Sequence, residues 1–204
     1  MNEINWSEKA ILKLLSVQFK EISKKPMIVS WIMQLIDSAY GKKEWLTKWT
    51  NDQFIKYSSD KKSKVYLLSQ KFNNGIYADR VNKIEKYVTK LIYRKDKGEY
   101  WQTAEETLTL GVGDCEDQNN LIYILCRLVG VPNWLLYNAI GETGNGRHFY
   151  CLFYYAPRME LIPVDSTYYV ETGSMADQKP FRISSLGYHA PEYIWNENHA
   201  FKWK

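Results

Sequence analysis

The sequence is poor in cysteine and has no long apolar run. It contains three cysteines in 204 residues and no Cys-x-x-Cys pair, a pattern that argues against a disulfide framework and a zinc ribbon and favours a reducing compartment. No apolar run approaches the roughly 18 residues that cross a bilayer. Residues 1–20 also lack an uninterrupted apolar segment followed by a small-residue cleavage site. We therefore expect a protein without a membrane span or a secretion signal, either cytoplasmic or assembled into a particle.

The overall composition is that of a folded globular chain. Apolar residues make up 45% and charged residues 25% of the sequence, which excludes the collagen-like and disordered classes. The length suits one domain of ordinary size with a helical extension, and it is too short for two full-sized domains with separate cores.

The charge is divided unevenly along the chain. Residues 1–100 carry a net charge of +9, whereas residues 101–204 carry −5. The lysines of the first half are scattered among acids in sequence of helical character, which favours a solvated helical face over a nucleic-acid footprint. This basic region is a candidate surface for docking on a protein partner in a larger assembly.

Hydrophobic spacing divides the chain into a helical part and a strand-rich part. Apolar residues recur near helical spacing over residues 7–22, 27–40, 44–58, 64–72, 77–93 and 121–129. Aromatic and β-branched runs then predict strands at residues 134–140, 149–155 and 160–164. A glycine-rich loop at residues 141–146 makes the first two strands an antiparallel pair. The sequence therefore predicts an α+β fold in which helices precede a small antiparallel sheet.

A turn marks the expected domain boundary. The Asn73-Asn74-Gly75 turn separates the first helices from the rest of the chain. We expect residues 1–73 to form a helical N-terminal extension, and residues 74–204 to form the core that carries the chemistry.

The most informative segment is Gly-Val-Gly-Asp-Cys-Glu-Asp at residues 111–117. Its two glycines allow a sharp turn directly before a helix, so that Cys115 falls in the first helical turn. The partial positive charge of a helix N-terminus favours the thiolate there, and Asp114 can cap the helix together with Asp117. The carboxylates of Asp114, Glu116 and Asp117 act the other way, because nearby negative charge raises the pKa of a thiol. An ordinary buried cysteine behind a helix cap is the alternative interpretation.

A histidine and an aspartate are placed to complete a catalytic set. His148 opens one predicted strand, and Asp165 follows the end of another. In an antiparallel pair the end of the second strand returns to the start of the first. Asp165 would then accept a hydrogen bond from one imidazole nitrogen while the other nitrogen faces Cys115, in the chain order Cys, His, Asp.

The remaining histidines and cysteines fit such a site less well. His189 and His199 lie in sequence typical of loops and are expected to be surface or structural residues. Cys126 lies on a helical apolar stripe and Cys151 within an aromatic strand, so both are expected in the core.

Several of these motifs occur together in one known family. Residues 100–108 read Tyr-Trp-Gln-Thr-Ala-Glu-Glu-Thr-Leu, Gly113-Asp114-Cys115-Glu116-Asp117 follows, His148 opens a strand, and Asp165 stands in Val-Asp-Ser-Thr. This combination resembles the transglutaminase-like superfamily, in particular its bacterial and phage branch of cysteine proteinases. The resemblance covers about half of the chain, over residues 75–170.

The resemblance implies a papain-like core in which the cysteine helix packs on a sheet that carries the histidine and the aspartate. It implies Cys115 as the nucleophile, His148 as the general base and acid, and Asp165 as the orienting residue. The backbone N–H of Cys115 is then one oxyanion donor, and Trp101 or Gln102 supplies the second.

The resemblance also raises the question of a metal. In some members of this branch, acidic residues beside the cysteine bind calcium. Asp114, Glu116 and Asp117 are the residues open to that role here, beside the capping role already given to two of them. The chemistry of the Cys, His and Asp set requires no cofactor of its own.

The function that follows is hydrolysis of an amide bond in a protein or peptide substrate through a thioester acyl-enzyme. An acyltransferase or crosslinking transglutaminase is one alternative, because it shares the first half-reaction and resolves the thioester with an amine. A structural or docking component of a larger assembly, for example a virion or tail complex, is the other. The intact set of Cys115, His148 and Asp165 favours an enzyme.

Overall fold

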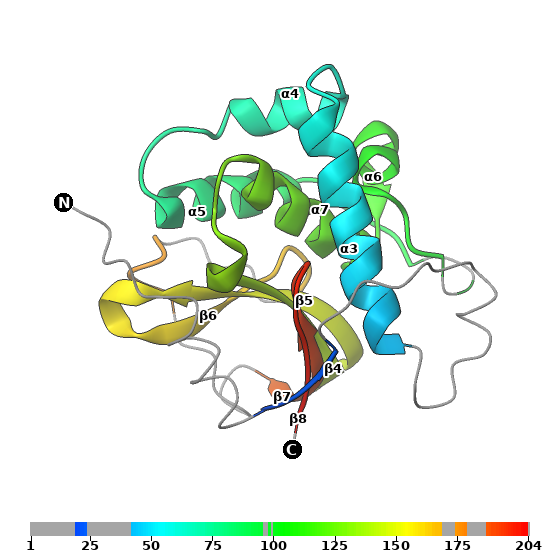
Figure 1. Ribbon diagram of the computed structural model, residues 1–204, viewed down its shortest axis with the longest axis vertical. Coiled ribbons are helices and arrows are strands. Elements are labelled where there is room, and N and C mark those ends of the chain that lie inside the picture. Colours follow the sequence, from blue (N-terminus) through cyan, green and yellow to red (C-terminus); the bar gives the residue numbers. More distant parts are fainter. Residues whose placement is uncertain are drawn as a thin grey trace.

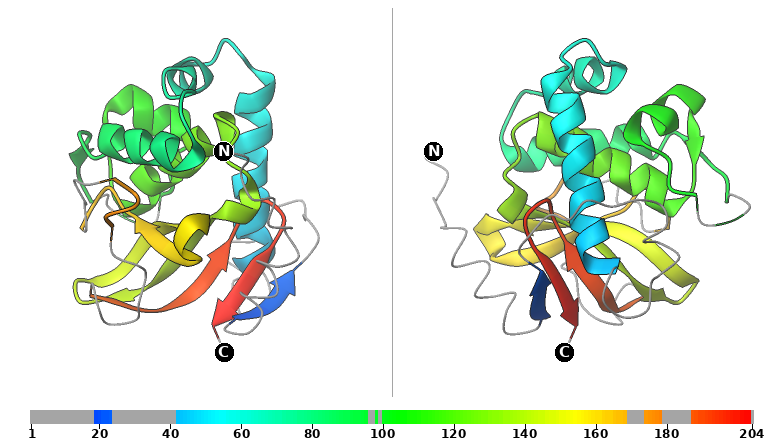
Figure 2. Two further views of the ribbon diagram at one scale, coloured as in Figure 1. Left: turned by 90° about the vertical axis from the view of Figure 1, so that its left-hand side faces the viewer. Right: turned by 45° about the vertical axis from the view of Figure 1, so that its right-hand side comes forward.

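The fold consists of helices gathered on one side of an antiparallel sheet (Figure 1; Figure 2). The computed structural model describes residues 19–23, 42–95, 98, 100–168, 174–178 and 187–203. Helices dominate residues 42–128, and strands dominate residues 136–203. The predicted α+β class is therefore confirmed.

The described helices and strands divide into three groups. The helices are α3 (Lys42–Ser59), α4 (Lys64–Gln70), α5 (Tyr77–Val88), α6 (Ala104–Leu110) and α7 (Cys115–Leu128), with short 3-10 turns at Asn133–Leu135 and Ala156–Arg158. The main sheet has the order β1-β8-β7-β4-β5-β6 and contains β1 (Phe19–Ser23), β4 (Leu136–Thr143), β5 (Gly146–Tyr155), β6 (Glu160–Val164), β7 (Tyr188–Trp195) and β8 (Ala200–Trp203). A separate parallel pair joins β2 (Ile92–Tyr93) to β3 (Val112–Gly113). None of the described helices combines the length and apolar character needed to cross a membrane.

The register of β5 and β6 positions the residues of interest. The two strands are antiparallel, and Cys151 of β5 pairs with Val164 at the end of β6. Asp165 directly follows Val164, so the chain leaves β6 toward the end of β5 that carries His148. The antiparallel return expected from the sequence is confirmed.

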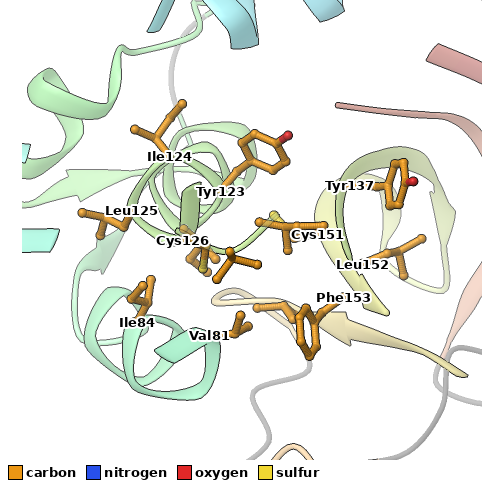
Figure 3. Close-up of a cluster of buried hydrophobic side chains, with 14 of the residues drawn as sticks. Val81, Ile84, Tyr123, Ile124, Leu125, Cys126, Tyr137, Cys151, Leu152 and Phe153 are labelled. Carbon is orange, nitrogen blue, oxygen red and sulfur yellow. The ribbon is translucent and has the colours of Figure 1, made fainter. Parts of the chain in front are cut away.

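Helix α7 lies at the centre of the core. Its side chains from Leu121 to Cys126 are fully buried. Figure 3 shows Cys126 of α7 beside Val81 and Ile84 of α5, with Cys151 of β5 on the side of α7 that faces the strands. Cys126 and Cys151 are both fully buried, which confirms the core positions predicted for them.

The first described strand corrects a sequence prediction. Residues 19–22 fall within the helix predicted at residues 7–22, but Phe19–Ser23 forms β1 and pairs antiparallel with β8. Hydrogen bonds to a distant strand outweigh the local helical spacing at these residues. The remainder of that predicted helix, and the whole of the one predicted at residues 27–40, lie outside the described residues.

Other boundaries differ because non-local pairing decides them. The helix predicted to run to residue 93 ends at Val88, because Ile92 and Tyr93 pair with β3. The loop predicted at residues 141–146 is shorter, because β4 continues to Thr143 and β5 begins at Gly146. Strands β7 and β8 were not predicted, and His189, expected in a loop, lies in β7.

Helices α3 and α4 share the core with the rest of the chain, although both precede the expected boundary. Tyr57 of α3 and Val65 of α4 belong to the same buried cluster as the α7 side chains. Gln53 Oε1 accepts a hydrogen bond from Ala104 N at 2.8 Å, and Tyr57 Oη accepts from Glu105 N at 3.2 Å. These bonds satisfy two of the free N–H groups at the start of α6. The boundary after residue 73 stays a prediction.

Candidate active site

Cys115 is the first residue of α7, directly after the turn that leaves β3. Gly111 closes α6 with φ of 68°, a left-handed conformation that glycine adopts without strain. Gly113 is required for a different reason, because a Cβ there would lie 2.6 Å from Asp117 Cβ. The two glycines of the motif thus let the chain turn closely against the start of α7.

Asp117 fixes the backbone on both sides of this turn. Its Oδ2 accepts from Asp114 N at 3.2 Å, and its Oδ1 accepts from Gln102 N at 2.8 Å. The side chain is almost fully buried. Asp114 and Asp117 form a capping box, as the sequence predicted, and Asp117 also holds the segment before α6 against α7.

The thiol of Cys115 is neutral in this arrangement. Its Sγ donates a hydrogen bond to Glu116 Oε2 at 3.0 Å. Burial raises the pKa of the Cys115 thiol, the charges of Glu116 and Asp114 raise it further, and a hydrogen bond from the backbone N–H of Phe149 acts to lower it. The sequence predicted that the acidic residues beside Cys115 raise the pKa of its thiol, and the structure has this effect.

Two carboxyl groups meet beside the thiol. Burial raises the pKa of Glu116 to about 8, and the adjacent carboxyl of Asp114, which lies within hydrogen-bonding distance, adds to this shift. The hydrogen bond from the Cys115 thiol acts in the opposite direction. Ionisation of the Glu116 carboxyl beside Asp114 is therefore less favourable than that of a free glutamate side chain.

His148 and Asp165 form a buried hydrogen-bonded pair. His148 Nε2 lies 2.7 Å from Asp165 Oδ2, and both side chains are almost fully excluded from solvent. Asp165 also accepts from Tyr188 Oη at 2.8 Å and from Thr167 N at 2.8 Å. A carboxylate surrounded by donors acts as an acceptor, so the proton of this imidazole is on Nε2.

The other imidazole nitrogen is left to act as a base. His148 Nδ1 is buried and has no hydrogen-bond partner among the described residues. The backbone N–H of the next residue, Phe149, contacts the sulfur of Cys115. The structure therefore brings Cys115, His148 and Asp165 into one region, with the basic nitrogen on the imidazole edge opposite Asp165.

Trp101 and Gln102, the two candidate oxyanion donors, have different surroundings. The ring of Trp101 packs at 4.8 Å from Trp45 and at 5.5 Å from Phe149, measured between ring centroids. This aromatic cluster also contacts Cys115. The backbone N–H of Gln102 is occupied by Asp117, and its Oε1 is buried without a partner in the described part of the chain.

Sequence analysis did not single out Tyr168, whose ring lies against the imidazole, or Tyr93, which lies beside Tyr168. The Tyr168 ring centroid is 4.4 Å from that of His148, and Tyr93 lies 6.4 Å from Tyr168. Burial and the hydrogen bond with Tyr168 raise the pKa of Tyr93. Tyr168 was within reach of sequence reasoning because it follows Asp165 closely, whereas Tyr93 comes from a strand that was predicted as helix.

Of the three acidic residues beside Cys115, only some are placed to bind a cation. Among the residues that the structure describes, no group of three or more His, Cys, Asp and Glu side chains is arranged to hold a metal ion. Both oxygens of Asp117 accept backbone N–H groups, which suits capping and not metal binding. The facing carboxyls of Asp114 and Glu116 are different, because two like charges held together attract a cation such as Ca²⁺.

Comparison with known families identifies the superfamily of the chain. The model of the transglutaminase-like superfamily matches residues 67–197. The match covers more than half of the chain, and the chain therefore belongs to the transglutaminase-like superfamily. The resemblance noted from the motifs is thereby confirmed. No curated protein sequence matches the chain significantly.

Solved structures show the same fold. Calcium-bound Legionella pneumophila LapG has a TM-score of 0.52 and 20% identity, over 96% of this chain and 87% of that chain. EGTA-treated LapG of the same organism has a TM-score of 0.52 and 21% identity, over 87% of each chain. At this level of identity the likeness concerns the fold alone.

Proposed function

We propose that this protein is a cysteine-dependent hydrolase of amide bonds in proteins or peptides. The proposal rests on one observation above the others. The buried pair of His148 and Asp165, 2.7 Å apart, leaves His148 Nδ1 without a partner in the described structure. The backbone N–H of the following residue, Phe149, contacts Cys115 Sγ. A nucleophile, a base and an orienting carboxylate are thus supplied by α7, β5 and the end of β6.

The acylation step follows from these positions. The Cys115 thiol gives its proton to His148 Nδ1, and Sγ attacks the carbonyl carbon of the substrate. The backbone N–H of Cys115 and the indole N–H of Trp101 are the proposed donors to the oxyanion. The imidazolium then protonates the amide nitrogen, the C–N bond breaks, and a thioester remains on Cys115.

In deacylation, His148 first acts as a base toward water and then returns a proton to the sulfur of Cys115. His148 takes a proton from water, whose oxygen attacks the thioester carbon. The carboxylic acid leaves, and the thiol of Cys115 is restored with the proton held by the imidazole. Asp165 keeps the imidazole oriented throughout.

The free protein is in a resting state with respect to this chemistry, since the thiol donates to Glu116. Reaction requires the thiol to turn from Glu116 Oε2 toward His148 Nδ1. Calcium, which is bound in one of the LapG structures, is proposed to bind Asp114 and Glu116 in this chain. When bound, a cation supplies positive charge that offsets both carboxylates and weakens their effect on the pKa of Cys115.

Terbium luminescence tests this cation site without relying on activity. Tb³⁺ added to the protein should give emission sensitised by nearby aromatic rings, and Ca²⁺ should displace it. Asp114→Asn should lower the affinity for both ions about tenfold or more, whereas Glu142→Gln, at an exposed carboxylate of β4, should not. Equal terbium affinity in wild type and Asp114→Asn would contradict the site.

Thiol alkylation tests the proposed nucleophile. At pH 7, iodoacetamide should label Cys115 far faster than Cys126 or Cys151, which are fully buried. His148→Ala should slow labelling of Cys115 about tenfold or more at pH 7. It should have little effect at pH values high enough to ionise the thiol without a base.

His189→Ala is the matched control, because His189 is exposed on β7 and should leave the rate unchanged. Equal labelling of wild type and His148→Ala at pH 7 would contradict the activated nucleophile and favour the structural or docking role.

A glutamine-bearing peptide incubated with a primary amine separates hydrolysis from acyl transfer. Free acid supports hydrolysis, and an amine adduct detected by mass spectrometry supports acyl transfer.

A further inference from the structure

Asn119 lies one helical turn after Cys115 and is fully buried. Its Nδ2 donates to the backbone oxygen of Cys115 at 3.0 Å and to that of Phe149 at 2.9 Å. The same nitrogen lies 3.5 Å from Asp165 Oδ1. On the other side of the carboxamide, Oδ1 accepts from Ser166 N at 3.2 Å. One side chain is therefore bonded to three separate segments of the chain.

The orientation of this carboxamide follows from its partners. Backbone carbonyls only accept hydrogen bonds, so the group that faces Cys115 and Phe149 must be the NH₂. A backbone N–H only donates, so the group that faces Ser166 must be the oxygen. The partners of the nitrogen and the partner of the oxygen thus indicate the same orientation of the carboxamide. Exchanging the nitrogen and the oxygen would break every one of these hydrogen bonds.

We propose that Asn119 is a positioning residue that fixes Cys115, His148 and Asp165 relative to one another. This inference rests on the proposed function. Each of its partners either belongs to that set or is the next residue along the chain. The carboxamide therefore joins the start of α7, the strand that carries His148, and the loop that carries Asp165.

The hydrogen bonds of Asn119 hold the backbone next to the proposed reacting groups, where small displacements would have the largest effect on the reaction rate. Reacting groups must be held close to the productive geometry, and a shift of about 1 Å can cost a hundredfold in rate. The Cys115 carbonyl and the Phe149 carbonyl set how far α7 stands from β5 at the level of the thiol. Ser166 and Asp165 set where the carboxylate stands relative to the same point.

Asn120 supplies an internal comparison. It is the next residue on α7 and is also fully buried, but its Nδ2 donates to Gln53 Oε1 on α3 at 3.3 Å. Replacing either residue by alanine removes a buried carboxamide of the same size from the same helix. Only the replacement at Asn119 removes bonds to the segments that carry the proposed triad.

The test compares Asn119→Ala and Asn120→Ala by two measurements. The first is the rate of Cys115 alkylation by iodoacetamide at pH 7, set against the melting temperature of each variant. Asn119→Ala should lower this rate about tenfold or more relative to Asn120→Ala at similar loss of stability. Asn119→Asp keeps the volume and the acceptor for Ser166 but removes the donor, and should be as impaired as Asn119→Ala.

The second measurement is the downfield proton resonance of His148 Nε2–H in its hydrogen bond to Asp165, assigned by its loss in His148→Ala. It should shift or broaden in Asn119→Ala and remain in Asn120→Ala. An unchanged resonance and an unchanged alkylation rate in Asn119→Ala would overturn the positioning role.

The two proposals fail in different ways. If wild-type Cys115 shows no His148-dependent reactivity while the His148 resonance still depends on Asn119, the proposed function fails and the positioning of the His and Asp pair stands. If wild-type Cys115 is reactive and the two alanine variants behave alike, the positioning role fails and the function stands. Should Asn119→Ala not fold, Asn119→Ser gives the same comparison with less volume lost.

Discussion

At the scale of single residues, the main feature of the site is a thiol held between opposing influences. The N-terminus of α7 and the backbone N–H of Phe149 favour the thiolate, whereas burial and the Glu116 and Asp114 carboxyls favour the neutral thiol. The second group prevails in the free protein. The pKa of the Cys115 thiol therefore depends on the position and the charge of Glu116.

Replacing Glu116 by glutamine tests this balance. The thiolate is the reactive form, and a raised pKa delays its appearance until higher pH. Glu116→Gln removes both the charge and the carboxylate acceptor, so the pKa of Cys115 should fall. In EGTA-containing buffer, the pH profile of Cys115 alkylation should move to lower pH, with about a tenfold faster rate at pH 8 for each unit of fall.

Glu142→Gln serves as the control because Glu142 is exposed on β4; its profile should overlay that of the wild type. A profile for Glu116→Gln that is unchanged or moves to higher pH would mean that Glu116 does not hold the thiol neutral.

Sequence reasoning recovered the residues whose neighbours form a motif. The segment around Cys115 and the strand-opening His148 were recognisable locally, and the antiparallel return of β6 was enough to pair Asp165 with His148. Asn119 carried a weaker signal, since a residue four positions after Cys115 lies on the same helical face. Tyr188 carried none, because only the order of strands in the sheet brings it to Asp165.

At the scale of elements, α3 acts as a support for the start of α6. Gln53 and Tyr57 accept from the backbone of Ala104 and Glu105, and these residues directly follow the segment that contains Trp101. An element that precedes the expected core boundary thus fixes one wall of the proposed site.

Gln53→Ala should lower the free energy of unfolding by about 1–3 kcal/mol, because it leaves the buried Ala104 N–H and the Asn120 carboxamide without their acceptor. Urea unfolding followed by tryptophan fluorescence measures this change. Gln70→Ala, at an exposed residue of α4, should stay within about 0.5 kcal/mol of wild type. A loss for Gln53→Ala no larger than that of the control would mean that α3 does not support α6.

Helices were easier to predict than strands for a physical reason. The apolar stripes of α5 and α7 repeat within each helix, so their spacing is visible locally. Residues 19–23 and 92–93 form strands only because of partners far along the chain, at β8 and β3. Strand β7 contains Pro191 and Glu192 within its run, which hides the alternation that a strand otherwise shows.

At the scale of the whole molecule, the superfamily match and the buried core cover different ranges of residues. The match begins at residue 67, within α4, yet α3 before it contributes Thr50, which accepts from Trp195 Nε1 at 3.0 Å. Part of the basic half of the sequence therefore contacts the buried core. Some of the basic half is structural, and docking by the N-terminal region stays a prediction.

The pairing of β1 with β8 has a consequence for how the chain folds. Phe19 lies opposite Trp203, so β1 is synthesised long before its partner strand and stays unpaired until β8 has left the ribosome. Contacts of such long sequence separation form slowly, because most of the chain must be ordered before they close. Until then the edge of β7 is unprotected, and the nascent protein is at its most vulnerable to aggregation during this interval.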